Sequence, residues 1–374
     1  MRVLHVAQPT DGGVAAYVVA AAVDQLARGW EVAVACPGDS KLAADLATLG
    51  IRHERWEAVR SPGPSAFGEA RRLGRIVARY RPDAVHLHAS KAGLAGRLHL
   101  RRRLPTLFQP HGWSWLAVNG GMRKASIAWE RVATRWTSLF VCVGEGEASQ
   151  GHAAGLRAKQ TVIRNGVDLR RFRPADDVAR AVARAEVGVG PDTPLAVCVG
   201  RVTRQKGQDV LLSAWQSVHG AELAIVGDGD LLPSLRALDV PGVRFVGAVD
   251  DVRVWLAAAD LVVLPSRWEG LPLTALEALA TGRPVVASDV PGLAEVITPS
   301  VGQLVPVERP TELAGALSRR LGDPALRRRE SEAAADRAAE FDLRRTFDQL
   351  AAATVDVATA VPAALPVTNE QRAW

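Results

Sequence analysis

Residues 261–280 read LVVLPSRWEGLPLTALEALA, and this stretch contains one complete strand–loop–helix unit. The apolar run Leu261 to Pro265 predicts a buried strand, and the pattern from Leu273 onwards predicts a helix. Two glutamates, Glu269 and Glu277, are separated by seven residues across the loop and the first helical turn. Such units are typical of parallel α/β sheets, whose functional side chains collect at the carboxyl ends of the strands.

The same alternation occurs on both sides of a polar stretch, residues 170–192. We therefore expect an α/β protein with two tandem Rossmann-like, doubly wound parallel-sheet domains, residues 1–170 and 171–342. Ligands of such domains bind at strand ends, which here predicts an interdomain cleft. A helix over about 343–360 is expected to pack back on the first domain, and residues 361–374 read as a loose tail.

The composition of the 374 residues, 48% hydrophobic and 23% charged, is typical of a globular protein. No apolar run reaches the roughly 18 residues of a spanning helix, and Met1 to Val6 reads as a strand rather than a signal peptide. We therefore expect a cytoplasmic protein. Cys36, Cys142 and Cys198 stand singly in apolar runs, which predicts small core residues.

The net charge of +6 is unevenly distributed, since residues 1–170 hold 24 Lys and Arg against 13 Asp and Glu, and the remainder holds 22 against 27. Arginines are dense in residues 71–81 and 97–103. A basic face favours an anionic partner, here the inner face of the plasma membrane or a lipid-linked phosphate. No nucleic acid is expected, because no nucleic-acid-binding motif accompanies the arginines. For either cluster alone, a solvated helix face remains the alternative.

Several residues after predicted strands suit a diphosphate. Gly200 permits a tight turn, Arg201 offers a planar bidentate donor, and Lys206 offers a compact charge. Backbone N–H groups at the start of the helix near Leu273 suit an anion, while the two glutamates suit sugar hydroxyls. The alternative is that Glu269 and Glu277 are ordinary loop and helix charges. Gly227 is a further candidate for the wall of a nucleotide-binding site, although the sequence Gly-Asp-Gly at 227–229 is also common in ordinary turns.

In the first domain, Gly12 and Gly13 follow the opening strand and begin a helix. They lack the six-residue dinucleotide fingerprint, so no nicotinamide cofactor is indicated, and a plain strand-to-helix turn is the alternative. His111 also follows a predicted strand, where its imidazole suits a sugar hydroxyl or a developing charge. His86 and His88 alternate along another strand, and we expect at least one of them to be a core group.

Together these motifs, with the run from Asn165 to Asp168, resemble glycosyltransferase family 4, the retaining enzymes of the GT-B fold. The resemblance implies that Arg201 and Lys206 hold the diphosphate of a nucleotide-sugar and that Glu277 binds its ribose. It places the transferred sugar against Glu269 and the first helical turn, and Gly13 and His111 beside the reacting centre. The implied donor-binding residues are Gly12, Gly13, Gly200, Arg201, Lys206, Gly227, Glu269, Gly270, Leu271, Leu273, Thr274 and Glu277, and the implied catalytic residues are His111, Glu269, Arg201 and Lys206. Gly144 departs from the family, which commonly has Ser there.

The run from His86 to Gly93 is most similar to the branch that builds capsular, exopolysaccharide or lipid-linked oligosaccharide chains. A polyprenyl-diphosphate-linked acceptor is then implied, with four tryptophans available for the membrane interface: Trp113, Trp115, Trp129 and Trp136.

We expect a hexosyltransferase that moves a hexose or N-acetylhexosamine, with a UDP-sugar favoured as donor, to a glycan or lipid-linked sugar. No cofactor or metal is expected, because cations and helix N-termini neutralise the diphosphate. The alternatives are glycosylation of a small molecule or natural product, a GT-B epimerase, and a sensor that binds a nucleotide-sugar without turning it over.

Overall fold

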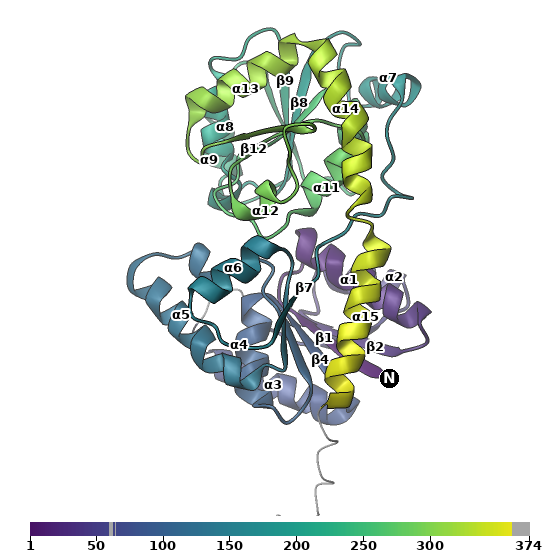
Figure 1. Ribbon diagram of the computed structural model, residues 1–374, viewed down its shortest axis with the longest axis vertical. Coiled ribbons are helices and arrows are strands. Elements are labelled where there is room, and N and C mark those ends of the chain that lie inside the picture. The colour runs from purple at the N-terminus through teal and green to yellow at the C-terminus, as the bar shows by residue number, and fades with distance from the viewer. Residues whose placement is uncertain (60–62, 64, 361–374) are drawn as a thin grey trace, which may run out of the picture. The chain divides into compact units, whose positions relative to one another are not determined.

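The computed structural model describes residues 1–59, 63 and 65–360 (Figure 1). These residues divide into two compact units. Unit 1 contains residues 1–142, 151–161 and 347–360, and unit 2 contains residues 143–150 and 162–346. The expected tail, residues 361–374, lies outside the described residues.

Unit 1 has a sheet with strand order β3-β2-β1-β4-β5-β6-β7. The pairs from β3 to β6 are parallel, and β1 lies between β2 and β4, which is the point where the strand order reverses. Its strands are β1 (Arg2–Ala7), β2 (Glu31–Cys36), β3 (Arg52–Arg55), β4 (Ala84–His88), β5 (Thr106–Gln109), β6 (Leu139–Cys142) and β7 (Gln160–Val162).

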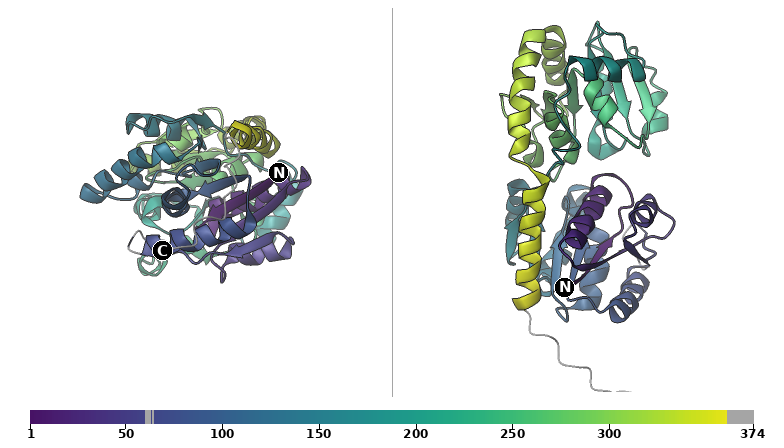
Figure 2. Two further views of the ribbon diagram at one scale, coloured as in Figure 1. Left: turned by 90° about the horizontal axis from the view of Figure 1, so that it is seen from below. Right: turned by 90° about the vertical axis from the view of Figure 1, so that its right-hand side faces the viewer.

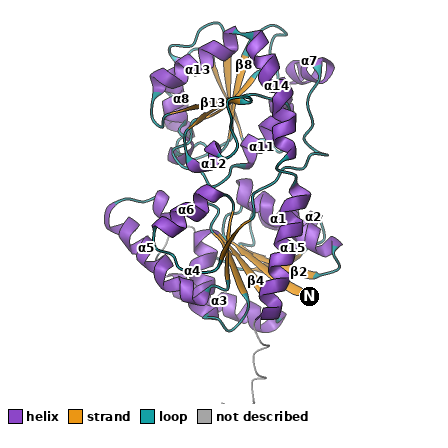
Figure 3. Cartoon of the chain, viewed as in Figure 1, coloured by secondary structure: helices purple, strands orange, loops and turns teal. Residues whose placement is uncertain are grey.

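Helices cover both faces of this sheet (Figure 3). They are α1 (Gly12–Ala27), α2 (Lys41–Thr48), α3 (Ser65–Tyr80), α4 (Ala89–Leu100), α5 (Gly120–Ala133), α6 (Glu145–Ala153), the 3-10 helices η1 (Ser114–Leu116) and η2 (Thr134–Trp136), and α15 (Leu343–Ala360). Two of them, α6 and α15, begin in residues assigned to unit 2.

From Phe347 onwards, helix α15 packs on α1 within unit 1 (Figure 2). The ring of Phe347 lies edge-on to that of Tyr17, with 5.6 Å between centroids, and Arg28 forms a 2.6 Å ion pair with Asp348. The C-terminal helix therefore completes the first unit of the chain.

Unit 2 has a wholly parallel sheet with strand order β10-β9-β8-β11-β12-β13. Alternate residues of β8 belong to two different hydrophobic clusters, Leu195 and Val197 to one and Ala196 and Cys198 to the other. Both faces of the sheet are therefore buried. The strands are β8 (Leu195–Val199), β9 (Glu222–Val226), β10 (Val243–Gly247), β11 (Leu261–Leu264), β12 (Val285–Ser288) and β13 (Gly302–Val305).

The helices of unit 2 connect these strands (Figure 1). They are α7 (Asp177–Glu186), η3 (Arg204–Lys206), α8 (Gln208–Trp215), α9 (Leu232–Arg236), α10 (Arg253–Ala258), α11 (Leu273–Ala280), α12 (Pro291–Ala294), α13 (Pro310–Gly322) and α14 (Pro324–Ala339). No helix among the described residues is long and apolar enough to cross a membrane.

The structure divides the chain earlier than the expected boundary after Arg170. The backbone N–H of Val167 donates to the carbonyl of Phe341, and that of Leu343 donates to the carbonyl of Val167. The Asn165 side chain donates to the carbonyl of Leu271 at 2.7 Å. These bonds fasten the segment from residue 162 to unit 2.

The strands expected at Met1 to Val6 and at Leu261 to Pro265 are present as β1 and β11 within one residue at each end, and α11 begins at the predicted Leu273. Strand β3 was not predicted, because its sequence Arg-His-Glu-Arg has no apolar residue. It lies at the edge of the sheet, where charged strands are common. All three cysteines are buried and free, as expected.

Candidate functional site

The predicted diphosphate residues of unit 2 follow β8, and the predicted sugar-binding residue Glu269 follows the neighbouring strand β11. Lys206 lies at the end of η3, and its Nζ is 2.7 Å from Oε1 of Glu269. The hydroxyl of Ser266 donates to the same oxygen at 2.7 Å. Glu269 is only 8% exposed, so its carboxylate is paired, hydrogen-bonded and largely removed from water. The structure thus brings two predicted site residues into direct contact.

The two loops that carry this pair are fastened to each other. The Gln205 side chain donates to the carbonyl of Trp268 at 3.0 Å, and the backbone N–H of Arg267 donates to the carbonyl of Gln205 at 2.8 Å. Gly207 has a φ of +69°, and a Cβ there would lie 2.0 Å from the carbonyl oxygen of Pro265. Only glycine permits this approach, which holds η3 against the end of β11.

Gly200 and Gly227 lie together at the ends of β8 and β9. The Gly200 N–H donates to the carbonyl of Val226, and a Cβ on Gly227 would lie 2.1 Å from the Gly200 carbonyl oxygen. The Gln208 side chain donates to the Arg201 carbonyl at 2.9 Å and so orients the backbone beside Gly200. The predicted wall residue Gly227 is therefore in contact with the predicted diphosphate loop.

Glu277 lies one turn inside α11, after Leu273 and Thr274. The pKa of Glu277 is raised to about 7, mainly by burial; the charge of Arg171 opposes this rise, and that of Asp251 adds to it. The sequence analysis did not identify Arg171 or Asp251. Their charges carry no local motif, and only the fold brings them near Glu277.

The loop before α11 offers backbone groups. Its N-cap residue is Pro272, which makes no side-chain capping bond. The N–H of Ala275 donates to the Pro272 carbonyl at 3.2 Å, so the N–H groups of Leu273 and Thr274 are the ones that suit an anion. Gly270 lies in this loop, and Gly292 packs so closely on it that a Cβ would lie 1.7 Å from the Gly270 carbonyl oxygen. Leu271 is buried, with its carbonyl bound by Asn165.

Glu295 is a unit 2 residue that the sequence analysis missed. Its carboxylate accepts from the backbone N–H of Gly146 at 2.6 Å and lies 3.4 Å from Nε of Arg164. A Cβ on Gly144 would lie 2.7 Å from the same carboxylate. The glycine at position 144, where the family commonly has Ser, therefore makes room for Glu295. This departure was the one feature of the sequence that could have indicated a close neighbour at position 144.

In unit 1, His111 follows β5 in a left-handed backbone conformation, with a φ of +54°. Such a conformation is uncommon for a residue other than glycine and is often found at functional sites. Nε2 of His111 lies 3.1 Å from Nδ1 of His88, which is fully buried. His88 is thus a hydrogen-bonded core group, as expected of at least one of the pair with His86.

The two glycines predicted in unit 1 lie at the start of α1. Gly12 has a φ of +67°, and both Gly12 and Gly13 are exposed. Asp11 at the N-cap makes no side-chain capping bond, so the first N–H groups are not capped by it. Gly12, Gly13 and His111 belong to unit 1, and the remaining predicted residues belong to unit 2.

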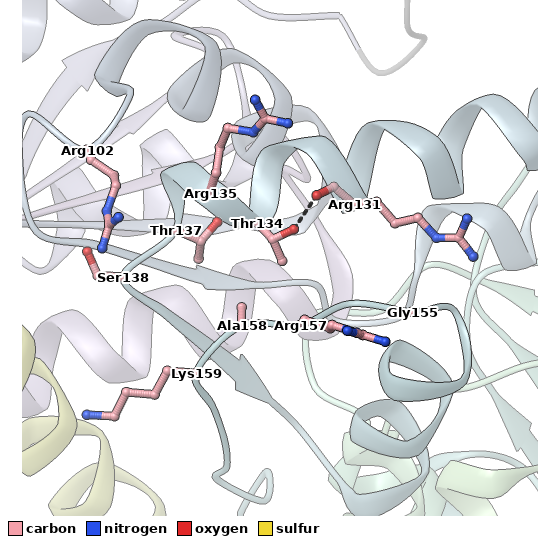
Figure 4. A pocket seen from close by; sticks show the side chains of 10 residues that line it. All are labelled: Arg102, Arg131, Thr134, Arg135, Thr137, Ser138, Gly155, Arg157, Ala158 and Lys159. Atoms are coloured by element: carbon pink, nitrogen blue, oxygen red, sulfur yellow. Dashed lines mark hydrogen bonds between the residues drawn. The ribbon is translucent and has the colours of Figure 1, made fainter.

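A basic pocket of about 560 Å³ lies in unit 1 (Figure 4). Its lining residues precede the strands β5, β6 and β7, so it lies at the amino ends of the strands, away from the edge that carries His111. The lining contains no carboxylate and five cationic side chains, which are Arg102, Arg131, Arg135, Arg157 and Lys159.

Part of the expected membrane surface is buried. Trp113 and Trp115 stack at 4.4 Å inside unit 1, and Arg97 is fully buried in an ion pair with Glu130. The prediction that these residues face an interface is wrong, because their aromatic and guanidinium groups fill the core. Trp136 remains partly exposed, and the centroid of its ring lies 5.6 Å from the guanidinium carbon of Arg101.

Comparisons with known proteins agree with this architecture. A model described as Glycosyltransferase Family 4 matches residues 11–171, and one described as Glycosyl transferases group 1 matches residues 193–323. The D-inositol 3-phosphate glycosyltransferase of Actinosynnema mirum is 31% identical over 385 residues, which cover 91% of each chain.

A relative of the same name from Jonesia denitrificans is 33% identical over 66% of this chain, and the match spans 65% of that relative's length. Among solved structures, Anabaena Alr3699/HepE in complex with UDP-glucose has a TM-score of 0.83 and 22% identity, covering 95% of this chain and 100% of that one. The chain belongs to glycosyltransferase family 4 and has the GT-B fold of two parallel-sheet α/β domains.

Proposed function

We propose that the chain is a retaining hexosyltransferase that uses a nucleotide-diphosphate sugar, with UDP favoured as the nucleotide. The observation that carries this proposal is the contact between Lys206 and Glu269 beside the uncapped start of α11. A cation and a carboxylate after neighbouring strands, together with N–H groups at the start of α11, match the phosphate and the hydroxyls of a sugar nucleotide.

In this mechanism Arg201 and Lys206 stabilise the charge that develops on the leaving diphosphate. The bond between the anomeric carbon and the diphosphate oxygen breaks, the acceptor hydroxyl oxygen attacks from the same face, and the leaving phosphate oxygen takes the hydroxyl proton. Glu269 positions the sugar, and Glu277 binds the ribose hydroxyls. Side-chain cations and amides meet the diphosphate charge, so the proposal includes no metal ion.

Glu269 is poorly suited to be a covalent nucleophile. One of its oxygens already holds both Lys206 and Ser266, and these bonds stabilise the carboxylate in place. A front-face displacement or a short-lived ion pair therefore accounts for retention better than a glycosyl-enzyme does.

The first test is a screen of nucleotide-sugars for thermal stabilisation, since a ligand of the native state raises the melting temperature. Turnover of the stabilising donor is then followed by NMR of the product, with an anomeric configuration equal to that of the donor expected. An inverted product, or a sugar adduct trapped on a carboxylate, would overturn the mechanism. Binding without release of nucleotide diphosphate would favour a sensor, and a donor isomer recovered without transfer would favour an epimerase.

The acceptor that we propose is a glycan or polyprenyl-diphosphate-linked sugar in cell-surface polysaccharide assembly. A small phosphorylated acceptor is the second candidate, because the relative that matches 91% of the chain is named for D-inositol 3-phosphate. The polyprenyl-diphosphate-linked sugar and the inositol phosphate both carry phosphate and suit the basic unit 1. Parallel reactions with membrane extract and with inositol phosphates separate them by whether the labelled sugar partitions into organic solvent.

We also propose peripheral contact between unit 1 and anionic membrane, as part of a cytoplasmic location. The basic pocket and the partly exposed Trp136 support this contact. The pocket lies at the amino ends of the strands and His111 lies at their carboxyl ends, so the proposed role of the pocket is docking rather than acceptor binding. Sedimentation with vesicles of anionic and neutral lipid tests it.

A further inference from the structure

Four side chains of unit 1 form a continuous row of hydrogen-bond contacts that ends at His111. Oε1 of Gln25 lies 2.9 Å from Nε2 of His5, and Nδ1 of His5 lies 2.9 Å from Nε2 of His88. Nδ1 of His88 then lies 3.1 Å from Nε2 of His111. The row connects helix α1, strands β1 and β4, and the loop after β5.

The imidazoles in this row are neutral. His5 and His88 are fully buried, and burial lowers the pKa of His5 to about 4 and that of His88 well below its usual range. Burial also lowers the pKa of His111. A neutral imidazole has one nitrogen that donates and one that accepts, so each ring passes a single direction of hydrogen bonding to the next.

Gln25 sets that direction because its amide oxygen can only accept. Nε2 of His5 therefore carries the hydrogen, and Nδ1 of His5 accepts from His88. The same reasoning places the hydrogen of His88 on Nε2, so its Nδ1 accepts from Nε2–H of His111. The remaining nitrogen of His111, Nδ1, is left with a lone pair.

We propose that Gln25, His5 and His88 are positioning residues that hold His111 as its Nε2–H tautomer, with Nδ1 ready to accept from a substrate hydroxyl. This role rests on the proposed function, which places His111 beside the transferred sugar. The left-handed backbone at His111 needs such support, since that conformation is otherwise disfavoured. Ala89, directly after His88, has a φ of +62°, so both ends of the last contact lie beside constrained backbone.

A metal ion is the competing use of these histidines, because nitrogens of His5, His86 and His88 lie within 4.8 Å of one another. Two nitrogens bound to one tetrahedral zinc lie roughly 3.3 Å apart, given Zn–N bonds of about 2.0 Å. The 2.9 Å between His5 and His88 is shorter and fits a hydrogen bond. Neither ring nitrogen of His86 is hydrogen-bonded to Gln25, His5, His88 or His111, so His86 stands outside the row.

Histidine ¹⁵N NMR on the unsubstituted protein tests the proposal directly. We expect a protonated Nε2 and a bare Nδ1 on His111, with couplings across the hydrogen bonds from His5 to His88 and from His88 to His111. The opposite tautomer, or about one equivalent of metal in the purified protein bound through these histidines, would overturn it.

Two variants then test whether Gln25 sets the direction of hydrogen bonding along the row, and whether that direction matters for turnover. Gln25→Met removes the acceptor while keeping a similar shape, and we expect it to move at least about a third of His111 to the other tautomer and to lower kcat about tenfold with little change in donor KM. The matched control is His86→Leu, which deletes a neighbouring buried imidazole and is expected to preserve both tautomer and turnover. Equal losses in the two variants would identify a packing effect and contradict the positioning role.

The NMR readout needs no turnover, so it separates this inference from the proposed function. A changed tautomer with unchanged kcat would overturn the positioning role while leaving the transfer reaction in place. Failure of the wild-type protein to transfer sugar, with the expected tautomer present, would instead count against the proposed function.

Discussion

Nζ of Lys206 and Oε1 of Glu269 are 2.7 Å apart, with only 17% of the lysine side chain and 7% of the glutamate side chain exposed. Both charges are thus mostly desolvated and compensate each other in the ligand-free chain. In the proposed complex the lysine also binds the diphosphate. The ion pair therefore holds the lysine in place before the donor binds.

We predict that replacing Lys206 alone destabilises the fold more than replacing Lys206 and Glu269 together. Lys206→Met leaves the Glu269 carboxylate buried without its cation, which costs up to about 3 kcal/mol of unfolding free energy. The double variant with Glu269→Gln is expected to recover most of that loss. Chemical denaturation of the wild type, both single variants and the double variant measures the coupling, and additive losses would contradict it.

Glu277 predicts a pH dependence of stability. Its pKa is raised to about 7 in the folded chain from 4.5, so the unfolded chain loses this proton first as pH rises. The free energy of unfolding therefore falls between about pH 4.5 and 7, by at most about 3 kcal/mol, and levels off above pH 7.

Glu277→Gln should remove this fall, because a glutamine does not ionise. Denaturant titrations of the two proteins at pH 5 and pH 8 measure the difference, and an identical difference in both would assign the pH dependence to other groups. The same variant should weaken nucleotide binding, since the amide replaces one acceptor of the ribose hydroxyls with a donor.

Much of this architecture was predictable because parallel strands buried on both faces, such as β8 and β11, are continuous apolar runs. The loops after them carry Arg201, Lys206 and Glu269, so strand ends and charge together indicated one site. Strand β3 could not be recognised, because its residues are mostly charged.

Long-range contacts were the part that the sequence could not supply. Trp113 was expected at a membrane interface and Arg97 lies in an arginine-rich stretch, yet one stacks in the core and the other pairs with Glu130, 33 positions away. The row from Gln25 to His111 likewise connects four segments with no shared motif. Such pairings depend on the sheet order, which periodicity alone does not determine.

Gly207 is predicted to tolerate no side chain. Gly207→Ala places a Cβ 2.0 Å from the Pro265 carbonyl oxygen and forces alanine to a φ of +69°, so we expect a loss of about 3 kcal/mol or more. Gly315→Ala is the matched control, because it lies in α13 with open space around its Cβ position. That change should stabilise the helix by up to about 1 kcal/mol. Thermal melts that rank the two variants equally would contradict the close approach of η3 to β11.

Donor binding and membrane docking are predicted to depend on different arginines. Arg201→Ala should weaken binding of the nucleotide-sugar by about tenfold or more, because it removes a charge-assisted contact to the diphosphate. Arg102→Ala should retain donor affinity and lose sedimentation with anionic vesicles, by up to about fivefold, which corresponds to about 1 kcal/mol per surface cation.

Arg328→Ala is the control for charge alone, since Arg328 is exposed on α14 in unit 2. It removes the same charge as Arg102→Ala but lies outside the basic pocket, so vesicle binding should be preserved. If Arg102→Ala and Arg328→Ala bind vesicles equally, net charge rather than the pocket accounts for any association. Calorimetry with the donor and sedimentation with vesicles are independent measurements. If the donor and the membrane bind to two distinct regions, Arg201→Ala should lose donor binding in the first and keep vesicle binding in the second.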